Sequence, residues 1–239
     1  MNPIIAVIQG KLGRFTSFES SMDKLRAYTV AQTGKYHRGY RASGLNPAMA
    51  RNKAVEGLLD DRECDSIIFF DDDQVFPSDT LQRLCAILDQ GYGLAAPLIL
   101  KTEPPFQSVA WQYIDGGLVP FVPWGHSGIV DVDEIGTGIL AVRREVFEKI
   151  EPPWFRLGQI DGFPAEMQED VWFARAARAA GYRIGLDVDF AAGHTGPFTV
   201  WPDVLNDCVV IAGGPGVKMS IPSSVLRSTP EKQPAAVGL

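Results

Sequence analysis

Short apolar segments alternate with helical patterns along the first part of this chain. The apolar segment SIIFF at residues 66–70 is continuous, as expected of a strand that is covered on both faces. Such alternation is typical of parallel strands joined by helical crossovers, so we predict an α/β fold with a mostly parallel sheet flanked by helices. The predicted strands lie at residues 3–8, 66–72 and 93–100, and the predicted helices at 17–28, 46–61 and 78–91.

Length and charge limit what this fold can contain and bind. A chain of 239 residues with 46% hydrophobic residues is long enough for one large core. We expect a single domain over residues 1–222 and a flexible tail over residues 223–239, where the sequence is polar and contains proline. The net charge of -7 and the absence of a dense Lys/Arg run argue against nucleic acid or an anionic membrane as the main partner.

The N-terminus and the cysteines favour a cytoplasmic protein. The apolar run at residues 3–8 follows no basic region, so we interpret it as a first strand and not as a signal peptide. No apolar run approaches the ~20 residues that a membrane-spanning helix needs. Cys64, Cys85 and Cys208 form no C-x-x-C pair, which is typical of reduced, buried thiols.

Three further segments have recognisable chemistry. Residues 78–91 contain a capping serine, Ser78, and a terminating glycine, Gly91, and Gly181 ends a later helix.

Residues 101–134 are rich in proline, glycine and aromatic residues, which predicts a loop-rich insert of the kind that is usually functional. The aromatic residues of the insert would stack on sugar rings or form the core of a lid. They are Trp111, Tyr113, Phe121 and Trp124.

Three consecutive carboxylates follow the apolar strand. Side chains alternate along an extended segment, so Asp71 and Asp73 share one side and Asp72 points away. Ligands of open parallel sheets bind beyond the carboxyl ends of the strands, where these residues lie. Because neighbouring carboxylates repel each other, the Asp-x-Asp pattern favours a metal or nucleotide site over a surface turn that caps the next helix.

Four segments follow one another between about residues 45 and 196: NPAMARNKAVEGLLDD, SIIFFDDDQVFPSDTLQRL, GTGILAVRREVFEKI and MQEDVWFARAARAAGYRIGLDVDFAAGHTG. In this order they resemble the ARN helix, the Asp-x-Asp strand, the acceptor-side glycine turn, and the Glu-Asp motif with closing histidine of GT-A-fold glycosyltransferases, especially the family-2 group. The resemblance implies a Rossmann-like GT-A domain with an acceptor-side insert. It also implies transfer of a sugar from a nucleotide-sugar to a hydroxyl acceptor.

The resemblance implies a role for each matching residue. Asp73 and His194 would ligate Mn²⁺ or Mg²⁺, which neutralises the charge on the departing nucleoside diphosphate. A lone histidine is more often structural, and glycines next to a strand also form ordinary tight turns. The residues implied in binding the nucleotide-sugar are Asp71, Asp72, Arg51, Asn52, Gly136 and Gly138.

The resemblance also implies a catalytic base at the start of a helix. Asp170 would take the proton of the acceptor hydroxyl in a single displacement with inversion, with Glu169 or Glu166 as substitutes. Acids in the first turn of a helix also gain ~0.3–1 kcal/mol from the helix dipole without any catalysis. Both explanations therefore apply to Asp170 and Glu169.

Two alternative hypotheses share this architecture. A sugar-nucleotide pyrophosphorylase would need a glycine-rich, arginine-containing phosphate loop after the first strand, which QGKLGRF matches poorly. A non-catalytic carbohydrate-binding relative would have no need for both Asp73 and Asp170. The chain lacks the acid with which family-2 enzymes read uracil, so the donor nucleotide is open between UDP and GDP.

Overall fold

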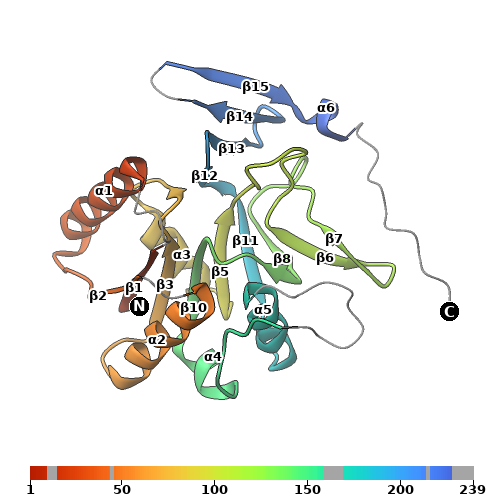
Figure 1. The fold of residues 1–239 in the computed structure, drawn as a ribbon. Helices are drawn as coiled ribbons and strands as arrows, with labels where there is room; N and C mark the ends of the chain where they lie inside the picture. Colours follow the sequence, from red (N-terminus) through yellow and green to blue (C-terminus); the bar gives the residue numbers. More distant parts are fainter. Residues whose placement is uncertain (10–14, 44–45, 159–168, 214–215, 228–239) are drawn as a thin grey trace.

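The protein is built on three β-sheets, of seven, five and three strands. The computed structural model describes residues 1–239 except residues 10–14, 44–45, 159–168, 214–215 and 228–239. Helices cover the largest sheet, and strands β13 to β15 extend away from it (Figure 1). Among the described residues, no helix is both long enough and apolar enough to cross a membrane.

Most strands of the central sheet run in one direction. Their order is β2-β1-β3-β10-β5-β11-β8, and β10 and β8 run against the other strands. The prediction of an α/β fold with a mostly parallel sheet flanked by helices is thus confirmed. The strands are β1 (Pro3–Gln9), β2 (Gly39–Ser43), β3 (Ser66–Asp71), β5 (Leu94–Leu98), β8 (Ile129–Val132), β10 (Ile139–Arg143) and β11 (Ile184–Ala191).

Neighbouring residues of each central strand face opposite layers of helices. On β3, Phe69 packs into the cluster that contains α2, α4 and α5, whereas Ile68 and Phe70 pack into the cluster with α1 and α3. The strand is therefore covered on both faces, as its continuous apolar sequence predicts. The helices are α1 (Thr16–Thr33), α2 (Pro47–Asp60), α3 (Thr80–Asp89), α4 (Arg144–Lys149) and α5 (Glu169–Ala179).

Two predicted helix ends are confirmed and one predicted start is wrong. Gly91 and Gly181 follow α3 and α5 with φ of 91° and 93°, in the left-handed region that glycine adopts without strain. Helix α3 begins after Asp79 and not after Ser78. The reason is a turn ahead of the helix, in which the hydroxyl group of Thr80 donates to the carbonyl oxygen of Pro77 at 2.6 Å.

The five-stranded sheet links the segment after β3 to the C-terminal part of the chain. Its order is β15-β14-β13-β12-β4, with every pair antiparallel. Strand β4 starts directly after Asp73 and pairs with β12, so that Gln74 lies opposite His194. The strands are β4 (Gln74–Val75), β12 (Gly193–Thr195), β13 (Thr199–Asp203), β14 (Cys208–Ala212) and β15 (Lys218–Pro222).

The insert at residues 101–134 is less loop-rich than predicted. It contains a β-hairpin whose two-residue turn is Asp115 and Gly116, with φ of 51° and 81°. An Asp-Gly pair between two apolar segments is a strong hairpin signal. The proline and aromatic content of the surrounding sequence masked it. The strands in and next to the insert are β6 (Ala110–Ile114), β7 (Gly117–Pro120) and β9 (Glu134–Ile135), besides β8.

The first residues of the predicted tail are helical, because helix α6 (Ser223–Arg227) follows β15. Ser223 is fully buried, and its hydroxyl group donates to Asp207 Oδ1 at 2.5 Å. Leu226 packs against an apolar cluster that includes Val200 and Val209. The rest of the predicted tail, residues 228–239, lies outside the described residues.

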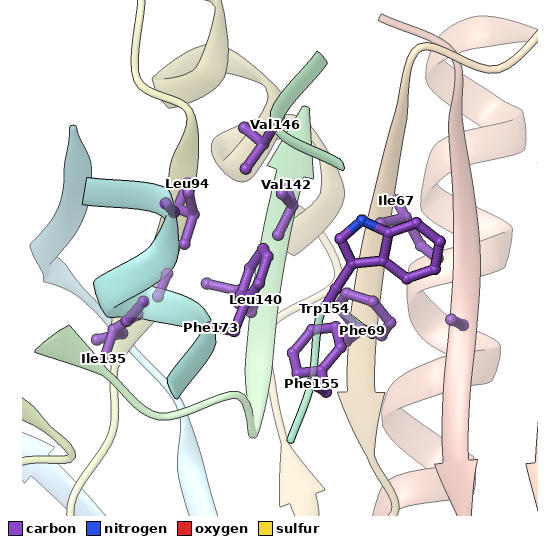
Figure 2. Close-up of a cluster of buried hydrophobic side chains, with 14 of the residues drawn as sticks. Ile67, Phe69, Leu94, Ile135, Leu140, Val142, Val146, Trp154, Phe155 and Phe173 are labelled. Carbon is purple, nitrogen blue, oxygen red and sulfur yellow. The ribbon is translucent and has the colours of Figure 1, made fainter. Parts of the chain in front are cut away.

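We expect the aromatic cluster under α5 to carry much of the stability of the fold. Phe173 is fully buried and lies near Phe155 in the cluster of Figure 2, with a ring-centroid distance of 4.5 Å. Phe173→Ala should lower the free energy of unfolding in urea by ~3–5 kcal/mol, because it removes buried area and leaves a cavity. Phe15→Ala, at a 41% exposed phenylalanine, is the control and should change it by less than ~0.5 kcal/mol. Equal losses in both variants would contradict this packing.

Candidate active site

The carboxyl ends of β3 and β5 border a cavity of about 560 Å³. Helix α2 precedes β3 and α5 precedes β11, so both helices begin at the sheet edge where these strands end. Strand β10 is antiparallel to β3, and the segment before it therefore reaches the same edge. The charged and polar residues that line the cavity are Arg51, Asp71, Asp73, Gln74, Lys101, Glu134, Thr137, Glu169, Asp170, Arg175 and His194.

Arg51 lies at the base of this cavity and joins three elements. Its Nη2 donates to both carboxylate oxygens of Asp71 at 2.6 and 2.8 Å, and its Nη1 donates to Glu169 Oε1 at 2.6 Å. The side chain is only 2% exposed. Two carboxylates can share one guanidinium because its donors form a planar fork. Arg51, predicted to lie near the nucleotide, thus holds the acids of α5 and β3 in place.

The three aspartates after β3 differ as the alternation predicts. Asp71 and Asp73 line the cavity, whereas Asp72 is 8% exposed and donates its backbone N–H to the carbonyl oxygen of Ile8 at 3.2 Å. Burial raises the pKa of Asp71, and the guanidinium of Arg51 opposes this rise. Asp72 does not line the cavity, and its implied contact with the nucleotide-sugar stays a prediction.

Asp73 and His194 lie side by side at the cavity. His194 Nε2 is 3.4 Å from Asp73 Oδ2, and the backbone N–H of Thr195 donates to the Asp73 carbonyl oxygen at 2.8 Å. Burial alone would raise the pKa of Asp73, but the imidazole of His194 together with the amide of Gln74 lowers this pKa. Burial alone would lower the pKa of His194, and Asp73 outweighs that effect and raises it.

The surroundings of His194 fit a metal ligand. Its Nδ1 lies 3.1 Å from the carbonyl oxygen of Leu100, which can only accept, so Nδ1 carries the proton and Nε2 is left for Asp73 or a metal. Two ligands of an octahedral ion, each ~2.1 Å from it, lie ~3 Å apart, which is close to the observed separation. Within the described ranges no three His, Cys, Asp or Glu side chains are placed to hold an ion. A metal here would therefore need further ligands from a bound molecule and water.

Glu169 and Asp170 are the first residues of α5. Glu169 is engaged by Arg51, whereas Asp170 lines the cavity and accepts a hydrogen bond from the N–H of Val171 at 2.7 Å. Burial and then the charge of Glu169 raise the pKa of Asp170 to about 6. A carboxylate with this pKa is mostly ionised at neutral pH and is a stronger base than an ordinary aspartate. The substitute base Glu166 lies outside the described residues.

Asn52 lies away from the cavity lining. Its Nδ2 donates to the carbonyl oxygen of Phe155 at 2.8 Å, and its Oδ1 accepts from the N–H of Phe155 at 3.1 Å. Both ends of the amide thus hold one stretch of backbone. The structure shows this structural contact, and the implied contact of Asn52 with the nucleotide-sugar stays a prediction.

Gly136 and Gly138 line the cavity, and close packing favours glycine at both positions. A Cβ atom would come within 3.2 Å of Val109 at the first and within 3.1 Å of the Gln74 amide at the second. Even the smallest side chain would therefore displace a neighbour at either position. Packing thus accounts for these glycines, whether or not a sugar approaches them.

Sequence reasoning missed three charged residues of the cavity, Lys101, Glu134 and Arg175. Lys101 is exposed, and its Nζ lies 5.7 Å from the ring centroid of Trp111. The position of Lys101 just beyond β5 could have indicated its place in the site, because ligands bind at the carboxyl ends of the strands. Glu134 is fully buried and pairs with Arg175. No sequence pattern distinguishes Glu134 from the neighbouring acids of the insert.

Three of the four aromatic residues of the insert line one of two cavities. Trp111 lines the cavity described above, whereas Phe121 and Trp124 line a neighbouring cavity of about 650 Å³. Tyr113 is 42% exposed, and its hydroxyl group donates to Glu134 Oε1 at 3.1 Å. Of the aromatic wall predicted for the acceptor, Trp111 alone reaches this cavity.

We expect Arg51 to be essential for stability. Arg51→Met leaves two carboxylates without their buried partner, which should lower the free energy of unfolding by ~3–5 kcal/mol. Lys53→Met, two residues further along α2, is the matched control because Lys53 forms an exposed ion pair with Glu56. Urea denaturation should show little change for the control. A similar midpoint for both variants would show that the Arg51 contacts are not needed.

Known proteins share the fold but little sequence with this chain. No family model matches the sequence, and no curated protein is similar to it. The crystal structure of A197 from STIV is similar with a TM-score of 0.63 and 18% identity, over 90% of this chain and 95% of that one. The structure of GalNAc-T7 with UDP, GalNAc and Mn²⁺ has a TM-score of 0.52 and 13% identity, over 80% of this chain and 42% of that one. At these identities the likeness establishes the fold, which matches the GT-A-like architecture of the glycosyltransferase GalNAc-T7.

Proposed function

We propose that this protein is a metal-dependent glycosyltransferase that moves a sugar from a nucleotide-sugar to a hydroxyl acceptor. The observation that carries the proposal is one cavity that brings together a potential metal pair, Asp73 and His194, and a potential base, Asp170. The ordered motifs in the sequence support the same assignment. So does the likeness in fold to GalNAc-T7, whose structure contains UDP, GalNAc and Mn²⁺.

The diphosphate end of the donor binds at Asp73 and His194. A carboxylate oxygen and an imidazole nitrogen suit Mn²⁺ or Mg²⁺, and diphosphate oxygens and water complete the shell. When bound, the metal neutralises the charge that develops on the leaving diphosphate. Lys101 adds a cation at this end, because it is exposed in the cavity and forms no ion pair with any described residue.

Asp71 contacts the nucleoside in this proposal. Arg51 fixes both of its oxygens in one orientation, and each oxygen keeps a lone pair for a ribose hydroxyl. Arg51 itself is a positioning residue, since its guanidinium already meets two carboxylates. Comparing the binding of UDP and GDP distinguishes which base the nucleotide carries.

Asp170 acts as the base. It takes the proton of the acceptor hydroxyl while that oxygen bonds to the anomeric carbon and the bond from this carbon to the diphosphate breaks. One displacement of this kind inverts the anomeric configuration. Glu169 is less suited to the role because Arg51 holds it in an ion pair at 2.6 Å.

Donor binding is expected to depend on the metal and on Asp73. UDP or GDP should raise the melting temperature of the protein with Mn²⁺ and not with a chelator, and Asp73→Asn should remove this shift. Asp23→Asn is the matched control, because Asp23 is 76% exposed on α1. Metal-independent stabilisation by either nucleotide would argue against the proposed metal site.

Transfer is expected to depend on Asp170 and on pH. Asp170→Asn should lower kcat by ~10²–10⁴-fold, the usual contribution of a general base, while donor affinity stays unchanged. Because burial and Glu169 raise the pKa of Asp170 to about 6, kcat/KM of the native enzyme should fall as the pH drops through this value and the base becomes protonated. Sugar transfer can be followed by mass spectrometry of the product. Near-normal turnover of the variant would exclude Asp170 as the base.

A further inference from the structure

Two buried oxygen atoms in the wall of the cavity have no hydrogen-bond partner among the described residues. They are Oε2 of Glu134 and Oε1 of Gln74. Both residues line the cavity that contains Asp73 and Asp170, and they are 0% and 2% exposed. A buried acceptor without a donor costs ~1–3 kcal/mol, so such atoms call for a donor that the protein alone does not supply, from water or from a ligand that displaces it.

The other half of the Glu134 carboxylate is fully used. Its Oε1 accepts from Arg175 Nε on α5 and from the Tyr113 hydroxyl group on β6. These two contacts hold one oxygen of the carboxylate from two different elements of the cavity wall. Oε2 is thus held in place without a donor, which is how a binding residue is prepared for a ligand.

The orientation of the Gln74 amide follows from its neighbour. Its nitrogen donates to Asp73 Oδ1 at 2.7 Å, and a carboxylate can only accept, so the amide oxygen must face the other way. Gly138, with no side chain, allows this amide to pack against its Cα. The cavity wall therefore offers a second fixed acceptor next to the proposed metal pair.

Two acceptors, one of them charged, select the chemistry of the ligand. A phosphate or carboxylate brings further acceptors and would be repelled by Glu134. A hydroxyl group brings a donor, and a sugar ring brings several at fixed spacing. We propose that Glu134 and Gln74 bind hydroxyl groups of the sugar that reacts in this cavity, and that Glu134 determines which sugar is accepted.

This inference rests on the proposed glycosyltransferase function and adds the residues that select the sugar. Both oxygens are covered in the ligand-free protein. Trp111 lies directly opposite Glu134 in the β6–β9 pair and also lines the cavity, so its ring is placed to pack against an apolar face of the sugar.

Glu134→Gln tests the proposal through the affinity that the sugar adds to a nucleotide. The Kd values of UDP and GDP are compared with those of UDP-glucose, UDP-N-acetylglucosamine and GDP-mannose, all with Mn²⁺. The variant should bind the nucleoside diphosphate within twofold of native affinity. It should lose about tenfold or more of the affinity for the preferred nucleotide-sugar, as expected for a lost hydrogen bond to a charged group.

Two further variants separate sugar binding from folding. Tyr113→Phe removes one of the two donors that hold Oε1 but keeps Oε2 and its charge, so it should lose less sugar affinity than Glu134→Gln does. Glu134→Asp keeps the charge beside Arg175 but withdraws the carboxylate by one methylene group, and it should lose sugar affinity as Glu134→Gln does. It serves in place of Glu134→Gln if that variant does not fold.

A second binding experiment decides whether Glu134 binds the sugar of the donor or the sugar of the acceptor. If the nucleotide-sugar is unaffected by Glu134→Gln, saturation-transfer NMR with methyl glucoside, galactoside and mannoside tests the acceptor in the presence of nucleoside diphosphate and Mn²⁺. Signal in the native protein that is lost in the variant assigns Glu134 to the acceptor sugar. Unchanged binding of both donor and glycosides would overturn the inference.

Failure of the proposed function gives a different result. In that case neither UDP nor GDP binds the native protein with Mn²⁺, and the glycoside experiment is carried out without nucleotide. A glycoside that binds the native protein and not Glu134→Gln would uphold the sugar site in a protein that is not a transferase. Absence of any glycoside binding would then overturn the sugar site as well.

Discussion

The buried guanidinium of Arg51 is the contact on which the rest of the cavity depends. It bonds Asp71 at the end of β3 and Glu169 at the start of α5 from a position on α2. Three elements that begin or end at one edge of the sheet are thereby held together by a single side chain. Separating a buried carboxylate from its guanidinium is costly, because each charge would then be buried without a partner. The contacts of Arg51 therefore fix the acids more firmly than surface ion pairs would. Asp170, next to Glu169, takes its position from the same contact.

The cavity lining combines two kinds of side-chain chemistry. Asp73 and His194, with Lys101 nearby, suit a metal and the anionic diphosphate that it binds. The oxygens of Glu134 and Gln74 suit neutral hydroxyl groups and disfavour a second anion. A nucleotide-sugar has these two chemistries in one molecule, because its diphosphate is joined directly to its sugar. The antiparallel strand β10 makes this possible, since the segment before it reaches the same sheet edge as the carboxyl ends of β3 and β5.

Features determined by near neighbours in the sequence were predictable, and contacts between distant residues were not. The apolar strand that ends at Asp71, and the glycine that ends α3, follow from local composition and conformation. Arg51 was predicted at the site from a motif, but its ion pair with Glu169 joins residues 118 positions apart. The Asp73–His194 contact likewise depends on the pairing of two very short strands. The unpaired oxygen of Glu134 has no counterpart in the sequence, because it arises from the packing of an insert that composition alone marked as loop-rich.

The position of the metal is the most direct test of the account. Crystals grown with MnCl₂ and UDP or GDP can be measured at the manganese absorption edge, where the ion gives an anomalous difference peak. The account predicts a peak within about 2.5 Å of both Asp73 Oδ2 and His194 Nε2, with diphosphate oxygens in the same shell. A nucleoside diphosphate bound in the cavity without a peak there, or a peak held by other residues, would contradict it.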